Sequence, residues 1–161
     1  MFYHKQNSQA NILKGLQIDE PMIFVPWDID ENVFSDMFKD HSISLVVENN
    51  YLVKDVTILG ESHCNIGVQF DNIVSEVSIS RDDYGEYHPD YMKSSEALKI
   101  ALMRSFMSFQ TALIREFGQP NKREILDTFE SFEWHIYSNI KIYHYIMDRF
   151  GLAEYLRIKK F

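Results

Sequence analysis

Two stretches of the chain, residues 54–79 and 132–158, alternate apolar and polar side chains. A period of two is typical of a β-strand that buries one of its faces. Short polar segments interrupt the alternation, so each stretch is predicted to form consecutive strands joined by hairpins. The positions predicted to face inward are Cys64, Ile66, Val68, Phe70, Ile73, Val77, Ile79, Phe132, Trp134, Ile136, Ile142, His144 and Ile146.

The turns set the expected register of the two main hairpins. Residues 71–72, Asp-Asn, tolerate the left-handed backbone of a two-residue turn, which would place Phe70 opposite Ile73. In the second hairpin an odd-length loop with a bulge keeps the apolar face continuous, and it would place Ile136 opposite Ile142. The other face of this second hairpin would then carry Glu133, His135, Tyr137, Lys141, Tyr143 and Tyr145.

The two stretches also resemble each other, together with the helical segment that precedes each. Apolar positions of the first align with apolar positions of the second, except that His144 aligns with Val68. Alternating patterns can align by chance, whereas a structural duplication would account for the preceding helices as well. The aligned pairs are Phe34 with Leu113, Phe38 with Phe117, Val56 with Trp134, Ile58 with Ile136, Ile66 with Ile142, Phe70 with Ile146, Val77 with Leu156 and Ile79 with Ile158.

We therefore predict an α+β fold in which two structurally similar helix–β-meander units form an antiparallel sheet with the helices packed on one face. The units span approximately residues 28–80 and 92–159 of a single domain, residues 1–161, and residues 81–91 link them. A chain of this length can bury a core large enough to need no disulfide.

Local signals predict the segments outside the two stretches. Residues 11–18 and 22–25 are short apolar runs, which predict one or two edge strands with a turn between them. Asp30 can cap a short helix that ends near Lys39. A longer helix is expected over residues 94–117, because its apolar residues recur at helical spacing and a glycine and a proline follow it. Its core stripe is Leu98, Leu102, Phe106, Phe109, Leu113 and Phe117.

The longer helix carries a second apolar patch formed by Ile100, Met103, Met107 and Ile114. Either the N-terminal segment packs on this patch, or the patch is a homodimer or partner surface. Flexible methionine side chains suit adaptable contacts of the second kind.

The cysteine content and the N-terminal residues indicate a compartment. Cys64 is the only cysteine, so it has no disulfide partner within the chain and fits the core of a protein in a reducing environment. The first fifteen residues lack the pattern of a signal peptide, and no window is apolar enough to span a membrane. We expect a cytoplasmic protein with no membrane partner.

Charge is distributed unevenly along the chain. Residues 1–92 contain sixteen acidic and five basic residues, residues 93–161 contain eight acidic and eleven basic residues, and the net charge is −8. An acidic surface disfavours nonspecific nucleic-acid binding, which needs a basic footprint. It either keeps the protein soluble or attracts a basic protein partner.

The sequence contains none of the common nucleotide-binding, hydrolase or zinc-binding motifs, so we expect no metal and no cofactor. One residue stands out, because His144 occupies a predicted inward position. With Trp134, Tyr143 and Tyr145 it could line a pocket between sheet and helix, as in a small ligand-binding protein or an enzyme. Otherwise it is a hydrogen-bonded core histidine.

An acidic, tyrosine-rich segment between the two units is the strongest candidate for an interaction site. Tyrosine side chains are rigid anchors at interfaces, and carboxylates would meet a basic cleft. The alternative is a solvated connector, and the spacing does not match that of a calcium-binding EF-hand loop. The candidate partner-binding residues are Asp82, Asp83, Tyr84, Glu86, Tyr87 and Asp90.

The tandem pattern of helix and antiparallel strands resembles the architecture of β-lactamase-inhibitor proteins and, for a single unit, of outer-membrane assembly lipoproteins. Phe117-Gly118-Gln119-Pro120, followed by Trp134, is similar to the helix-turn-strand junction of that architecture. The resemblance covers roughly residues 28–159, and the chain lacks the lipoprotein signal and the paired cysteines of secreted inhibitors. It is also similar to small acidic immunity proteins of bacterial toxin systems.

The absence of catalytic motifs, the uneven charge and the acidic, tyrosine-rich segment favour a non-enzymatic protein-binding module. We expect an immunity protein that neutralises a basic bacterial toxin, with no nucleic-acid partner.

Overall fold

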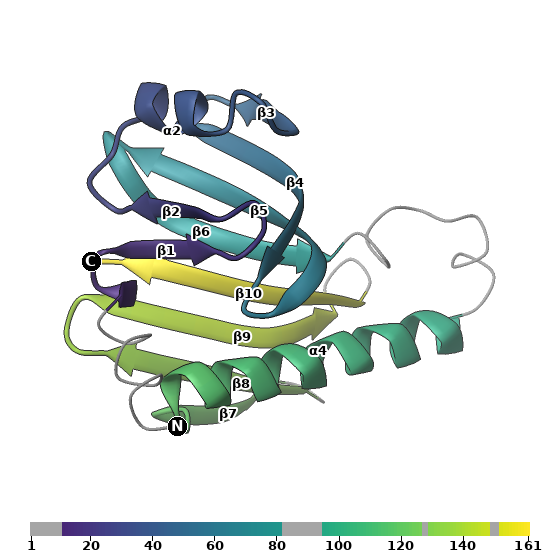
Figure 1. Ribbon diagram of the computed structural model, residues 1–161. Helices are drawn as coiled ribbons and strands as arrows, with labels where there is room; N and C mark the ends of the chain where they lie inside the picture. Colours follow the sequence, from purple (N-terminus) through teal and green to yellow (C-terminus); the bar gives the residue numbers. More distant parts are fainter. Residues whose placement is uncertain (1–10, 82–94, 127–128, 149–151) are drawn as a thin grey trace.

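The computed structural model describes residues 11–81, 95–126, 129–148 and 152–161 (Figure 1). It shows an α+β fold with an eight-stranded antiparallel sheet and a separate two-stranded hairpin. Two helices, α2 (Glu31–Met37) and α4 (Ser95–Phe117), accompany the sheet. The predicted fold class and the antiparallel sheet are confirmed. No helix in the described ranges is long and apolar enough to cross a membrane.

The eight strands of the sheet follow the order β3-β4-β5-β6-β10-β9-β8-β7. Strands β3 to β6 therefore form one meander, strands β7 to β10 form a second, and the two meanders join where β6 pairs with β10. The strands are β3 (Ile43–Val47), β4 (Asn50–Ile58), β5 (Glu61–Asp71), β6 (Ile73–Arg81), β7 (Lys122–Leu126), β8 (Phe129–Ile136), β9 (Ile140–Asp148) and β10 (Leu152–Lys160).

The junction between the meanders is well paired on both faces. On the buried face, Ile79 lies opposite Leu156 and Val77 lies opposite Ile158. On the other face, the guanidinium of Arg157 donates to both carboxylate oxygens of Glu76, at 2.6 and 2.8 Å. A bidentate pair of this kind fixes orientation as well as distance, so it holds the two central strands in register.

Local sequence signals produced the expected helices. The Asp30 side chain caps α2 by accepting a hydrogen bond from the backbone N–H of Val33 at 3.0 Å. Helix α4 ends at Phe117, and Gly118 follows with φ of 86°, a left-handed backbone that glycine adopts readily. Both predicted helices are thus confirmed.

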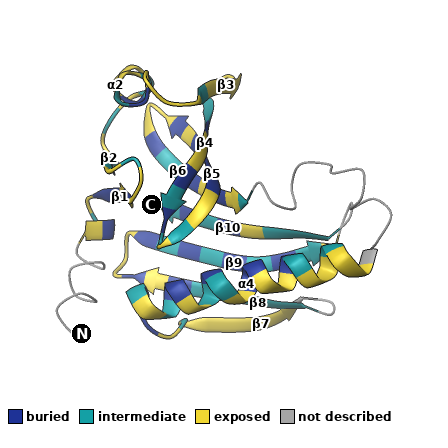
Figure 2. Cartoon of the chain, turned by 45° about the vertical axis from the view of Figure 1, so that its right-hand side comes forward, coloured by how far each residue is buried: buried dark blue, intermediate teal, exposed yellow. Residues whose placement is uncertain are grey.

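Buried side chains gather on one face of the sheet, which we call the inner face. Both helices contribute to the cluster that covers it, through Phe34 of α2 and the C-cap residue Phe38, and through Phe109, Leu113 and Phe117 of α4. Helix α4 is buried on the side that faces the sheet and exposed on the opposite side (Figure 2). The predicted inward positions Ile66, Ile142 and His144 are all fully buried.

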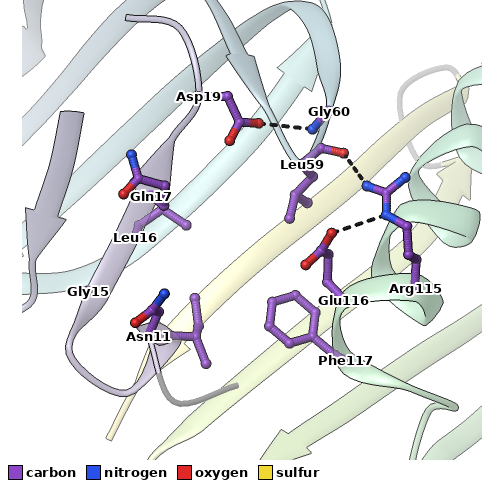
Figure 3. Close-up of a pocket in the computed structure, with 11 residues that line it drawn as sticks. Asn11, Gly15, Leu16, Gln17, Asp19, Leu59, Gly60, Arg115, Glu116 and Phe117 are labelled. Atoms are coloured by element: carbon purple, nitrogen blue, oxygen red, sulfur yellow. Dashed lines mark hydrogen bonds and ion pairs between the residues drawn. The ribbon is translucent and has the colours of Figure 1, made fainter. Parts of the chain in front are cut away.

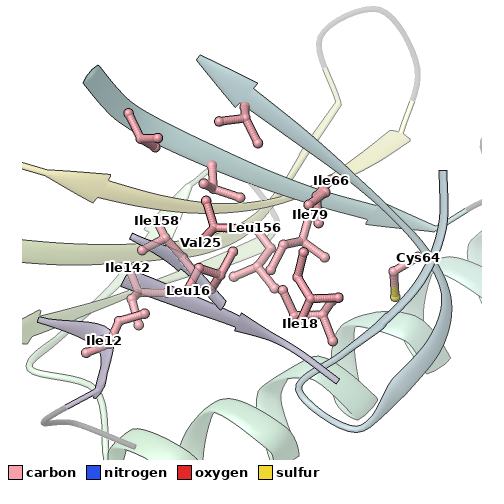
Figure 4. Close-up of a cluster of buried hydrophobic side chains, with 14 of the residues drawn as sticks. Ile12, Leu16, Ile18, Val25, Cys64, Ile66, Ile79, Ile142, Leu156 and Ile158 are labelled. Atoms are coloured by element: carbon pink, nitrogen blue, oxygen red, sulfur yellow. The ribbon is translucent and has the colours of Figure 1, made fainter. Parts of the chain in front are cut away.

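The N-terminal runs do not extend the edge of the main sheet. They form a hairpin, β1 (Gly15–Ile18) paired with β2 (Ile23–Pro26), which lies across the inner face (Figures 1 and 4). Its side chains Leu16, Ile18 and Val25 are at most 2% exposed and pack on the isoleucines of the sheet. Three backbone hydrogen bonds between residues 19–20 and Thr57 attach it to β4.

The predicted registers of both main hairpins are wrong by one or two residues. Phe70 lies opposite Val74 rather than Ile73, because Asn72, with a φ of 64°, alone separates the paired residues Asp71 and Ile73. A bulge at Ser75 then shifts the pairing once more, so that Gln69 lies opposite Glu76. Ile73 is consequently 37% exposed, whereas Val74 is 1% exposed.

The loop between β8 and β9 has three residues, 137–139, so its predicted odd length is confirmed, but the predicted bulge is wrong because the two strands pair without a register shift. Ile136 nevertheless lies opposite Ile140 rather than Ile142, and Trp134 lies opposite Ile142 rather than His144. The tighter register is possible because Tyr137 adopts a positive φ of 54°, which propensity disfavours for an aromatic residue.

Candidate functional site

A network of buried and half-buried polar side chains lies where α4 crosses the inner face of the sheet. It joins residues of β5, β6, β9, β10 and α4, and we call it the buried polar network. Its members are Glu61, Arg81, Ser105, Ser108, Gln110, His144 and Glu154.

His144 is the most enclosed member of this network. Its Nδ1 lies 2.7 Å from Oε1 of Gln110, and its Nε2 lies 2.7 Å from Oε2 of Glu154. The ring stacks on Phe106, with centroids 4.0 Å apart, and meets Phe109 edge-on. Burial lowers the pKa of His144, although the neighbouring Glu154 carboxylate acts in the opposite direction. No part of the ring is exposed to solvent.

Arg81 forms the other half of the network. Its Nε donates to Oγ of Ser105 at 2.8 Å, and its Nη2 donates to Oε2 of Glu61 at 2.8 Å. Its guanidinium also lies 4.5 Å above the ring of Phe109, where a cation–π attraction is expected. Burial alone would raise the pKa of Glu61, but hydrogen bonds from Arg81 and Ser108 outweigh it and lower that pKa.

Ser105 connects the two halves. Its hydroxyl donates to Oε1 of Glu154 at 2.5 Å and accepts from Nε of Arg81. All buried side-chain nitrogen and oxygen atoms of the described residues have hydrogen-bond partners. The network therefore ties helix α4 to strands β6, β9 and β10 by hydrogen bonds.

The sequence singled out His144 but not its charged partners. Arg81 continues the inward phase of Val77 and Ile79, and Glu154 precedes Leu156 by two positions. Because strand side chains alternate, both charges were already placed on the buried face. A basic and an acidic residue at inward positions of two strands, Arg81 and Glu154, were the sequence signal that could have predicted the network.

The residues predicted to share a pocket with His144 are divided between the two faces of the sheet. Trp134 is buried on the inner face, where its Nε1 donates to the carbonyl of Gly118 at 2.8 Å. Tyr143 and Tyr145 alternate with the inward positions and lie on the outer face. There Tyr145 stacks on Tyr155, with centroids 5.1 Å apart. The structure does not bring the four residues together.

A cavity of about 440 Å³ lies elsewhere, between β1, the β4–β5 turn and the C-terminal end of α4 (Figure 3). Arg115 Nη2 donates to the carbonyl of Leu59 at 3.0 Å, and the Gly60 N–H donates to Asp19 at 3.0 Å. The size is within the usual range for small-ligand sites. Its lining is Asn11, Ile12, Gly15, Leu16, Gln17, Asp19, Leu59, Gly60, Arg115, Glu116 and Phe117.

The remaining predicted interaction residues have different outcomes. The segment from Asp82 to Asp90 lies outside the described residues. In the helix patch, Ile100, Met103 and Met107 are 52%, 37% and 66% exposed. Ile114 is half-buried and packs against the core, so it is not part of that open surface.

The outermost strand β3 presents an exposed apolar surface that the sequence did not identify as an interaction site. Leu45, Val46 and Val47 are 58%, 60% and 60% exposed, and no charged residue occurs within β3. The opposite edge, β7, carries Lys122, Arg123 and Glu124 instead. The run of uncharged residues was a usable signal, but which strands form the edges depends on strand order.

Acidic side chains gather at the end of the molecule that carries α2 and β3, as the acidic first half of the sequence predicts. Around α2 and the start of β3, Asp28, Asp30, Asp36 and Asp40 are exposed. The basic residue Lys39 of this region pairs with Asp36 at 3.6 Å. This end of the molecule, which we call the acidic end, is therefore strongly negative.

The buried histidine predicts a pH dependence of stability. Because folding lowers the pKa of His144 below its usual 6.5, the unfolded chain binds a proton at a pH where the folded protein resists it. The free energy of unfolding should therefore be highest above about pH 6.5 and fall as the pH is lowered towards 5. Urea unfolding at several pH values measures this.

His144→Gln is the control for this pH dependence, and its free energy of unfolding should vary less between pH 7 and 5 than that of the unmodified protein. A free energy of unfolding that rises as the pH falls through this window would contradict the prediction. It would mean that the Glu154 carboxylate stabilises the protonated imidazole and raises the pKa of His144 in the folded protein.

Within the described ranges no cluster of three or more histidine, cysteine, aspartate or glutamate side chains could hold a metal ion. Comparisons of the chain with protein-family models, curated proteins and solved structures found no match.

Proposed function

We propose that this protein is a non-enzymatic protein-binding module, an immunity-type protein whose acidic surface blocks a basic toxin. The observation that carries the proposal is the exposed strand β3 beside the acidic end. Protein interfaces combine a largely apolar centre with a polar rim. Leu45, Val46 and Val47 would supply such a centre, and the aspartates around α2 would supply an acidic rim.

The charge of the chain supports a basic partner. The net charge is −8, and sixteen of the acidic residues fall in residues 1–92. Complementary charge accelerates association and discriminates against wrong partners, and its effect weakens as salt increases. The acidic segment from Asp82 to Asp90 belongs to the same half of the sequence and would add to this attraction.

Co-expression tests the proposed function. We expect the protein to restore growth to cells that produce the polypeptide encoded by the neighbouring reading frame, and the two proteins to co-purify. Failure to restore growth, together with absence of a complex, would refute the immunity role.

Charge reversal at the acidic end should weaken the complex. The double substitution of Asp36→Lys and Asp40→Lys removes exposed negative charge, and we expect affinity to fall on the order of tenfold at low salt. A second variant, with Asp82, Asp83 and Glu86 all changed to lysine, tests the linking segment. The matched control is Glu124→Lys, an exposed reversal at the opposite edge of the sheet. Equal losses in all three variants would point to overall charge rather than to this end.

We also propose that the two helix–meander halves are structurally similar units. The strand order supports this, because each half forms a four-stranded meander whose last strand, β6 or β10, lies at the centre of the sheet. A helix also precedes each meander, α2 before the first and α4 before the second. The pairing of Val77 with Ile158 and of Ile79 with Leu156 is what a local two-fold axis would produce. Superposition of an experimental structure of residues 28–80 on residues 92–159 should show a common backbone path, and divergent strands would refute the duplication.

A further inference from the structure

The open side of β3 has backbone groups available for another strand. Within the sheet, the Ser42 carbonyl accepts from the Lys54 N–H at 3.0 Å, and Ser44 lies opposite Leu52. Because hydrogen-bonding direction alternates along an antiparallel strand, Ile43 and Leu45 direct their backbone groups away from β4. The Ile43 N–H bonds locally to the His41 carbonyl at 2.9 Å. The groups of Leu45 therefore face the side of β3 on which no described strand pairs.

Edge strands normally carry features that prevent pairing with another chain. Strand β7 has them, since its Lys122 and Arg123 form ion pairs with Glu124 and Glu130. Strand β3 has no charge and no proline. Its protection is limited to a bulge between Leu45 and Val47, which leaves the segment 43–45 in regular register.

The surroundings of β3 determine what kind of strand would fit. Asp36 and Asp40 lie on the helix and loop that precede it, and Glu48 follows it directly. An added strand with lysine or arginine residues would therefore meet opposite charge, whereas a second copy of this chain would bring two acidic ends together. The area added by one short strand is too small to offset much repulsion.

We propose that a basic partner protein binds by adding an extended strand to the open edge of β3. The partner strand alternates apolar and basic residues, so that its backbone pairs with β3 while its cationic side chains approach the acidic end. Strand addition of this kind takes affinity from main-chain hydrogen bonds and specificity from alternate side chains. This inference rests on the proposed function and names the surface and the partner chemistry that it would use.

The test uses short capped peptides and the full chain labelled for amide NMR. The probe peptide alternates valine and lysine over seven residues, a first control replaces lysine by glutamate, and a second control is the probe with N-methylated alternate amides. We expect the probe to shift amide signals of residues 42–48 and to bind on the order of tenfold more tightly than the glutamate peptide. The N-methylated peptide should not bind, because it cannot pair.

Variants locate the binding edge. Leu45→Pro removes an outward N–H and should abolish binding. Leu45→Lys keeps the backbone, so it should weaken binding even if the proline variant fails to fold. The matched control is Ile125→Lys on β7, where the parent side chain is 75% exposed, and it should bind the probe normally.

Several results would overturn the proposal. These are shifts that map away from β3, equal binding of the lysine and glutamate peptides, or self-association through β3 in sedimentation experiments. The two proposals can fail separately. If Leu45→Lys binds the probe more weakly but restores growth as fully as the unmodified protein, the protein acts as an immunity protein through another surface, and strand addition as its mode of toxin binding is refuted. If β3 binds the probe but growth is never restored, the edge is a strand acceptor and the immunity role is wrong.

Discussion

Replacing Glu154 by alanine should lower the free energy of unfolding by about 2–4 kcal/mol, because it leaves two buried polar groups without an acceptor. The side chain is 2% exposed, and its two oxygens bond to His144 Nε2 at 2.7 Å and to Ser105 Oγ at 2.5 Å. Its removal leaves both groups buried without that acceptor, and it removes a carboxylate near Arg81, which then keeps only its ion pair with Glu61. An unsatisfied buried polar group costs roughly 1–3 kcal/mol. Urea denaturation at pH 7 measures the loss.

Two further variants show where the loss of stability comes from. Glu154→Gln keeps the length and one acceptor but removes the charge, so it should lose less stability than the alanine variant. Glu124→Ala removes an exposed glutamate that pairs with Lys122 at 3.0 Å, and surface pairs of this kind contribute little. A Glu154→Ala loss no greater than that of Glu124→Ala would show that the network does not stabilise the fold.

Gly15→Ala should destabilise the protein on the order of 3 kcal/mol. A Cβ atom at this position would lie 2.3 Å from the carbonyl oxygen of Val25 and 2.8 Å from Cα of Pro26. Both are backbone atoms of the facing strand β2, so the hairpin would have to separate. Because the hairpin covers the inner face through Leu16 and Ile18, its separation would expose apolar core. Thermal and urea unfolding both measure this effect.

Gly67→Ala is the matched control for this prediction. A Cβ atom there would meet Oγ of Ser78 at 2.6 Å, which is a side-chain atom that can rotate away. We expect its cost to remain below about 1 kcal/mol. Equal effects at the two positions would mean that the hairpin adjusts easily and that its close approach is not a constraint on the fold.

Alternation in the sequence predicted which side chains are buried better than it predicted which residues are paired. Ile66, Val77, Ile142 and Ile158 all face the core as expected. A bulge or a loop residue with positive φ changes which residues are paired without changing the amino-acid composition of a strand. The bulge at Ser75 had no sequence signal strong enough to outweigh the alternation of its neighbours.

The candidate sites depended on information that one strand at a time does not contain. The partners of His144 come from elements far apart in the sequence, and only their meeting on the inner face makes a network of them. Likewise, the sequence predicted a strand at β3, but its position at the edge follows from the pairing of β6 with β10. The hairpin β1–β2 was misplaced at an edge because its apolar runs gave no indication of which face they would cover.

The central pairing of the sheet joins strands that are far apart in the chain. Strand β6 ends at Arg81, whereas its partner β10 begins at Leu152. During synthesis the first meander can assemble as soon as residues 43–81 have emerged, but one side of β6 then remains without a neighbour until the entire second meander has been made. The pairing at the middle of the finished sheet is thus the last to form. Until then the edge of β6 is unpaired, and it could pair with a strand of another polypeptide and cause aggregation.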